Sequence, residues 1–156
     1  MERTSLSVAL IRKTYNQSLQ WLARLDPKTK KLTFVVSERL GKESFREATT
    51  REVAWELRLD RQRDFLVANM AQMNLEFIDQ LPDHRNKCHV TVSFYNVEIY
   101  RKDVVKSLEE DPNNFWVTSE EICDGKTQCG RVFHPLIPYL VARSNVIQYW
   151  ESSSQE

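Results

Sequence analysis

Residues 89–100, HVTVSFYNVEIY, are the segment that most restricts how this 156-residue chain can fold. Apolar residues stand at positions 90, 92, 94 and 97, and aromatic side chains are interleaved with them. This pattern predicts a β-strand that is buried largely on both faces, which requires other structure to pack on each side of its sheet. We therefore expect a mixed α/β domain.

The N-terminal part of the chain also predicts strands. Residues 5–13 (SLSVALIRK) and 18–25 (SLQWLARL) are rich in β-forming residues, and the polar step at Asn16 and Gln17 between them indicates a hairpin. The turn DPKTKK follows, with lysines that we interpret as solvated rather than phosphate-binding. A third strand, KLTFVVSER, comes next.

Charge and hydropathy narrow the classes of partner. Lys and Arg together number 22, as do Asp and Glu, so the net charge is zero and no broad basic surface attracts nucleic acid. A local basic patch remains open. No apolar run approaches the roughly 20 residues needed to cross a bilayer, and the N-terminus is a poor signal peptide. We expect a cytoplasmic protein with no nucleic-acid or membrane partner.

Three cysteines, Cys88, Cys123 and Cys129, fit a reducing compartment better than a disulfide framework. The last two could be drawn into a metal site with His134. Their spacings, with five and four residues between ligands, match none of the tight C-x2-C knuckles that mark zinc sites. We expect reduced thiols and no zinc, with a structural metal as the less favoured alternative.

The clearest helix signal is the capping box Ser44-Phe45-Arg46-Glu47, which opens a helix that continues to about residue 58. Within it, Glu52 and Glu56 are four residues apart and so lie about 40° apart around the helix axis. Trp55 lies about 60° to the other side of Glu52. Acidic residues at this spacing are usually only a solvated face, and a tryptophan is more often a packing residue than a ligand platform.

In the second half of the chain, some segments give a clear prediction of secondary structure and others do not. Residues 61–81 fit either a helix or strands, and alternation at Met73, Leu75 and Phe77 favours a strand near 72–80. A second capping box, Thr118-Ser119-Glu120-Glu121, opens a short helix that Gly125 closes.

A final amphipathic helix begins at Pro135 and Pro138 and extends to about Trp150. The residues after it, ESSSQE (151–156), predict a frayed tail. We therefore expect one domain over residues 1–150.

This order of elements resembles that of a Nudix domain over nearly the whole chain. The Nudix box is G-x5-E-x7-R-E-U-x-E-E-x-G-U, where U is aliphatic, and residues 37–59 align with it without gaps. Ser37 and Arg58 stand where the pattern has glycines, and Trp55 replaces the first glutamate of the pair. The later FWVTSEEI adds support, because Nudix domains often carry an aromatic strand and a short acidic helix there. The matching positions are Glu43, Arg51, Glu52, Val53, Glu56 and Leu59.

The resemblance implies an α+β fold, with a mixed β-sheet sandwiched between helices. It also implies Mg²⁺-dependent hydrolysis of a nucleoside diphosphate linked to another group. By this resemblance Glu52 and Glu56 would be metal ligands, and Glu43 would be an auxiliary ligand or a water-orienting base. Arg51 would fix the orientation of the glutamates. Glu98 is a further candidate base if its side chain points into the cleft.

The three departures from the box all weaken such a site. Trp55 supplies no oxygen ligand and brings bulk beside the ions. Ser37 and Arg58 should not tolerate a left-handed backbone or a close phosphate approach as glycine does. We therefore expect weak or absent Mg²⁺ binding and low or absent turnover.

Other functions stay open at this point, because activity depends on the site rather than on the fold. The same fold could bind a nucleotide-like ligand for regulation, or dock a partner through exposed aromatics. Arg51 could equally pair with Glu47 on the helix surface. Selectivity would come from variable loops near 61–72 and 101–115, which identify no substrate. Many Nudix domains are homodimers, so a homodimer also remains open.

Overall fold

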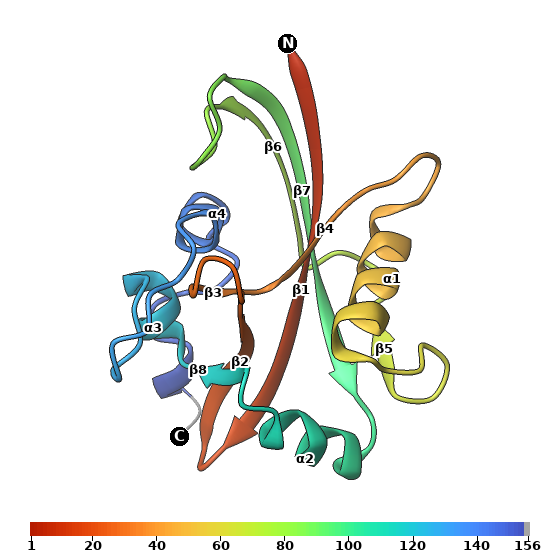
Figure 1. Ribbon diagram of the computed structural model, residues 1–156, viewed down its shortest axis with the longest axis vertical. Helices are drawn as coiled ribbons and strands as arrows, with labels where there is room; N and C mark the ends of the chain where they lie inside the picture. The colour runs from red at the N-terminus through yellow and green to blue at the C-terminus, as the bar shows by residue number, and fades with distance from the viewer. Residues whose placement is uncertain (155–156) are drawn as a thin grey trace.

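Two long parallel strands form the centre of the molecule, with helices on both sides (Figure 1). The computed structural model describes residues 1–154. Strands β1 (Glu2–Tyr15) and β7 (Cys88–Ile99) pair from Glu2 opposite Cys88 to Ile11 opposite Val97. Helix α1 (Phe45–Leu57) covers one side, and α3 (Ser119–Asp124) and α4 (Leu136–Ser144) lie on the other. The predicted α+β fold is confirmed.

Strand β1 belongs to two parts of the sheet. Its residues from Glu2 to Ile11 pair with β7, and four of them also pair with β4, whereas its last four residues pair with β2. The short strand β5 and the strand β6 both pair with the outer edge of β7, and β2 carries β3 and β8. The remaining strands are β2 (Ser18–Leu25), β3 (Leu32–Thr33), β4 (Val35–Glu38), β5 (Phe65–Val67), β6 (Met73–Asp79) and β8 (Asn114–Val117).

The hairpin predicted at Asn16 and Gln17 is confirmed. Both residues have positive φ, 49° and 63°, as a tight two-residue hairpin turn requires. The predicted third strand is divided at the buried Phe34, because the chain there crosses from pairing with β2 to pairing with β1. This division depends on distant partners that the local sequence does not reveal.

Alternating residues of the central strands supply two separate cores. Leu10 of β1 and Phe94 of β7 belong to the large core that also includes α4, while Ile11 and Val97 belong to the core beneath α1. Burial on both faces of the central strand is therefore confirmed. No helix within residues 1–154 is long and apolar enough to cross a membrane.

Both predicted capping boxes are present. The Ser44 hydroxyl accepts from the Glu47 N–H at 3.0 Å, and the Glu47 carboxylate accepts from the Ser44 N–H at 3.0 Å. Thr118 and Glu121 make the same reciprocal pair at the start of α3, which ends at Gly125 with φ of 74°. Local sequence signals determine both of these helices.

Three expectations were wrong. Residues 101–115, expected as a loop, contain helix α2 (Lys102–Glu110), whose N-cap residue Arg101 makes no side-chain capping bond. The last helix ends at Ser144 rather than near Trp150, because Asn145 is left-handed with φ of 57°.

The tail is also more ordered than expected. Residues Ser152–Ser154 form a 3₁₀ helix, and buried Ser152 exchanges hydrogen bonds with Ser119. Residues 155–156 lie outside the described part of the chain.

Candidate active site

The candidate site lies along helix α1, where Glu52 and Glu56 belong to the side that faces the sheet. Glu56 comes seven residues after buried Thr49, so the two lie within about 20° of each other around the axis. Val53, next to Glu52, is fully buried in the core beneath the helix. Both carboxylates are therefore partly covered, with side-chain exposures of 22% for Glu52 and 30% for Glu56.

Arg51 joins two of the predicted glutamates. Its Nε and Nη2 donate to the two oxygens of Glu43 at 2.8 and 3.1 Å, and its Nη1 donates to Glu52 at 3.0 Å. The Nη2 also donates to the backbone carbonyl of Glu38 at 3.1 Å. All three nitrogens of the guanidinium are thus used, and Glu47 serves the helix cap instead of pairing with Arg51.

These contacts favour the anionic form of Glu43. The hydrogen bond from Arg51 is the main reason that the pKa of Glu43 is lowered, and a bond from the Leu40 N–H at 3.1 Å adds to it. The same pair raises the pKa of Arg51. With both oxygens accepting hydrogen bonds, Glu43 is better placed to anchor Arg51 than to take a proton from water.

Glu56 has the opposite character. Burial, followed by the negative charge of Glu52, raises the pKa of Glu56 to about 7. Arg24 on strand β2 works against this increase, with its Nε 3.9 Å from Oε1 of Glu56. The sequence analysis missed Arg24, because it belongs to no motif and reaches the helix only through the tertiary fold.

The three positions that depart from the box have different environments. Trp55 is 79% exposed, so the alternative that it is a packing residue is wrong. Arg58 adopts the left-handed conformation at the end of α1, with φ of 56°, which our sequence interpretation had reserved for glycine. Ser37 lies buried in β4 and needs no left-handed backbone. Of these two positions, only Arg58 has the left-handed backbone that glycine adopts easily.

The other candidates lie apart from this site. Val97 packs beneath α1, and Glu98 alternates to the opposite face of β7, so Glu98 does not join the box residues. Cys123 contacts the carbonyl of Ile147, and Cys129 contacts Thr127.

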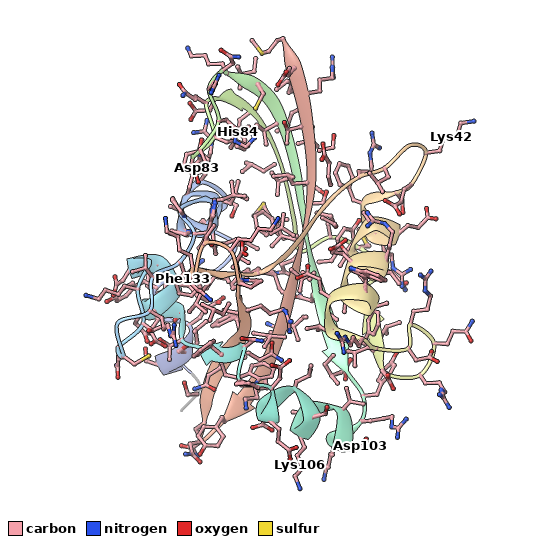
Figure 2. The ribbon with its side chains drawn as sticks, in the orientation of Figure 1. Lys42, Asp83, His84, Asp103, Lys106 and Phe133 are labelled. Atoms are coloured by element: carbon pink, nitrogen blue, oxygen red, sulfur yellow. The ribbon has the colours of Figure 1, made fainter. Side chains whose placement is uncertain are left out.

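His134 instead pairs with Asp83, at 3.1 Å, near the end of the molecule where Figure 2 marks Asp83 and His84. Within residues 1–154, no three or more His, Cys, Asp or Glu side chains are grouped as a metal site.

A cavity of about 430 Å³ includes Glu38 in its wall and lies on the face of the sheet opposite α1, where Leu6 and Leu136 belong to the large core. Glu38 links the cavity to the box, because its carbonyl oxygen accepts the hydrogen bond from Arg51. Polar and apolar surface contribute about equally to the wall of the cavity, and its volume falls in the range of roughly 300–1,000 Å³ that small-molecule sites have. The lining residues are Glu2, Arg3, Thr4, Leu6, Glu38, His84 and Leu136.

The arrangement of elements is that of known structures, although the sequence is not close to any of them. The Caenorhabditis elegans (C. elegans) Ap4A hydrolase superposes with a TM-score of 0.57 at 9% identity, over 99% of each chain. A Nudix hydrolase from M. smegmatis, RenU, gives 0.56 at 12% identity, over 92% of this chain and 84% of that one. This chain has a Nudix fold.

A third structure with a similar fold comes from a protein that has also been solved with DNA. NrtR from Shewanella oneidensis superposes with a TM-score of 0.60 at 10% identity, over 90% of this chain and 61% of that one. NrtR has also been solved in complex with a 27-mer DNA. No protein-family model and no curated protein matches this sequence. The Nudix fold is thus recognised from the structure.

Proposed function

We propose that this protein is a Mg²⁺-dependent hydrolase of a nucleoside diphosphate linked to another group, with a weaker metal site than a complete Nudix box provides. The observation that carries the proposal is the position of Arg51, which binds Glu43 and Glu52 together one helical turn before Glu56. Solved structures with the same fold include an Ap4A hydrolase and a Nudix hydrolase, which supports this choice of reaction.

The residues present fit one divalent cation. The raised pKa of Glu56 arises partly from Glu52, so these two carboxylates are close enough to repel each other. A cation between them would remove that repulsion. Mg²⁺ often takes only one or two carboxylates and completes its octahedron with water and substrate phosphates. When bound, it would bridge the diphosphate and align the attacking water.

The side chains of the protein would divide the remaining tasks. Arg51 fixes the direction of the Glu52 carboxylate, and the Glu43 anion fixes Arg51 in turn. Glu56, with its pKa of about 7, gains and loses a proton near neutral pH. Because a ligating carboxylate must be deprotonated, cation binding at Glu56 would be coupled to release of this proton.

The cavity beside Glu38 does not adjoin the box glutamates directly. Its wall provides hydrogen-bonding groups from Arg3, Thr4 and His84, and the Leu6 and Leu136 side chains supply apolar surface. The hydrogen bond from Arg51 to the Glu38 carbonyl connects this wall to helix α1. Because Leu6 and Leu136 belong to the large core on the face of the sheet opposite α1, a ligand in this cavity would reach the box glutamates only indirectly, through Glu38 and Arg51.

The test is release of nucleoside monophosphate or phosphate from a panel of nucleoside diphosphate derivatives, with and without Mg²⁺. We expect slow, Mg²⁺-dependent hydrolysis that Glu52→Gln and Glu56→Gln each reduce by roughly tenfold or more. Glu47→Gln is the matched control, because it makes the same change on the same helix and glutamine also completes a capping box. Nucleotide binding without any turnover would contradict the hydrolase and favour a ligand-binding domain.

A further inference from the structure

A second cavity, of about 300 Å³, opens on the face of the sheet opposite α1. It lies at the ends of β1, β5 and β7. The large core fills this face as far as Leu10 of β1 and Phe94 of β7. At the next positions on the same face, the side chains change from apolar to polar. The lining residues are Arg12, Leu66, Ala68, Asn96, Val97 and Glu98.

Opposite charges border this cavity without neutralising each other directly. Arg12 and Glu98 follow immediately after Ile11 and Val97, the last paired residues of the two parallel strands. Within residues 1–154, neither side chain takes part in a salt bridge. Arg12 acts over a longer distance on Glu151, whose pKa it lowers against the larger effect of burial. Arg12 and Glu98 thus do not neutralise each other, and Arg12 faces Glu151 as well as the cavity.

An apolar surface lies beside the two charges. Leu66 is 45% exposed, and strand alternation turns it to the same face as Ala68, while Phe65 and Val67 pack beneath α1. The volume is at the lower end of the range for small-molecule sites, roughly 300–1,000 Å³. A fitting ligand is therefore small and carries both charged and apolar parts.

We propose that this cavity binds a small zwitterion, an α-amino acid with an apolar side chain. Its carboxylate would accept hydrogen bonds from Arg12, its ammonium group would donate to Glu98, and its side chain would contact Leu66. A purely anionic ligand would meet repulsion from Glu98, and a purely cationic one would meet repulsion from Arg12. Only a ligand with one positive and one negative group can pair with both Arg12 and Glu98.

The test is calorimetric titration of L-leucine into the whole protein without metal or nucleotide. N-acetyl-L-leucine, which lacks the ammonium group, and L-leucinamide, which lacks the carboxylate, are the matched ligands. We expect each to bind roughly tenfold more weakly or worse, as loss of one charge-assisted hydrogen bond predicts. Chemical shifts in the protein should move around residues 12, 66 and 98.

Two variants locate the binding. Arg12→Gln and Glu98→Gln should each weaken leucine binding by roughly tenfold or more. Lys42→Gln, which changes an exposed charge in the loop before α1 (Figure 2), should leave it unchanged. Thermal unfolding of each variant checks that the exposed substitutions leave the fold intact.

Absence of leucine binding to the wild-type protein, or binding of either blocked ligand with the same affinity as leucine, would overturn the proposal. So would binding that Arg12→Gln and Glu98→Gln leave unchanged. The hydrolase proposal is independent of this result, because its metal-binding glutamates and Arg51 lie on or beside α1, on the other face of the sheet.

Discussion

Nε of Arg24 lies 3.9 Å from Oε1 of Glu56, so a strand at one side of the sheet places a cation beside the half-buried carboxylate of helix α1. The positive charge of Arg24 is not the largest influence on the pKa of Glu56. Burial and the charge of Glu52 still raise the pKa of Glu56 to about 7. The protonation state of this carboxylate thus depends on a balance among three neighbours.

The first prediction concerns that balance. Arg24→Gln should raise the pKa of Glu56 above about 7, because it removes a positive charge that favours the carboxylate. Carboxyl chemical shifts followed through a pH titration measure this directly. Arg61→Gln, at an exposed position in the loop after α1, is the control and should leave the titration unchanged. An unchanged Glu56 titration in Arg24→Gln would show that the pair is too distant to matter.

The second prediction is the pH dependence of stability. The pKa of Glu56 is raised from 4.5 to about 7 in the folded protein, so between these values the folded state binds more protons than the unfolded state. The stabilising contribution of the protonated Glu56 is complete below pH 4.5 and is lost as the pH rises through about 7. Glu56→Gln should therefore be more stable than wild type above pH 7, by an amount that disappears in acid.

Urea unfolding of both proteins across this pH range provides the measurement. Glu110→Gln, on the exposed side of α2, is the matched control and should follow the wild-type curve. Parallel pH curves for wild type and Glu56→Gln would contradict a raised pKa at this position.

The third prediction is that Trp55→Glu strengthens Mg²⁺ binding. The substitution supplies the carboxylate that the box lacks, and because Trp55 is 79% exposed it should change the unfolding free energy by no more than about 0.5 kcal/mol. Titration of Mg²⁺ or Mn²⁺ by calorimetry measures the affinity. Trp150→Glu adds the same charge at another exposed tryptophan and should have no effect. If wild type binds the metal ion as tightly as Trp55→Glu does, the metal site is not weakened. If neither protein binds the metal ion, helix α1 has only a structural role.

The fourth prediction is that Arg58→Gly stabilises the protein by about 1 kcal/mol. Arg58 is left-handed, with φ of 56°, a conformation that costs a residue with a Cβ atom roughly 1–2 kcal/mol relative to its preferred one. The greater freedom of glycine in the unfolded chain offsets part of the gain. Denaturant unfolding measures the change in stability. Arg63→Gly is the control, because Arg63 does not have a positive φ and glycine relieves no backbone strain there. A loss of stability in Arg58→Gly would mean that the arginine side chain makes a larger contribution than its backbone costs.

The sequence predicts best what is determined locally. The capping boxes at Ser44 and Thr118 contain both partners within one helical turn, and the hairpin at Asn16 needs only its own two turn residues. Helix α2 lacks such a signal, because Arg101 provides no side-chain cap. The prediction therefore failed where the boundary depends on packing.

The site divides in the same way. Glu43, Arg51 and Glu52 lie within one continuous segment, and their mutual hydrogen bonds follow the spacing of the box. Arg24 comes from a separate strand, and its approach to Glu56 arises only when the sheet has formed. The exposure of Trp55 also depends on how α1 packs, so sequence alone left its role open.

The parallel pairing of β1 with β7 has a consequence for the order of folding. Glu2 pairs opposite Cys88, so more than half of the chain separates the partners of the central pair. Closing such a long loop costs entropy before any contact repays it, and proteins rich in non-local pairings fold slowly. During synthesis, β1 therefore remains without its main partner until β7 has emerged, and its apolar residues are exposed to aggregation throughout that interval.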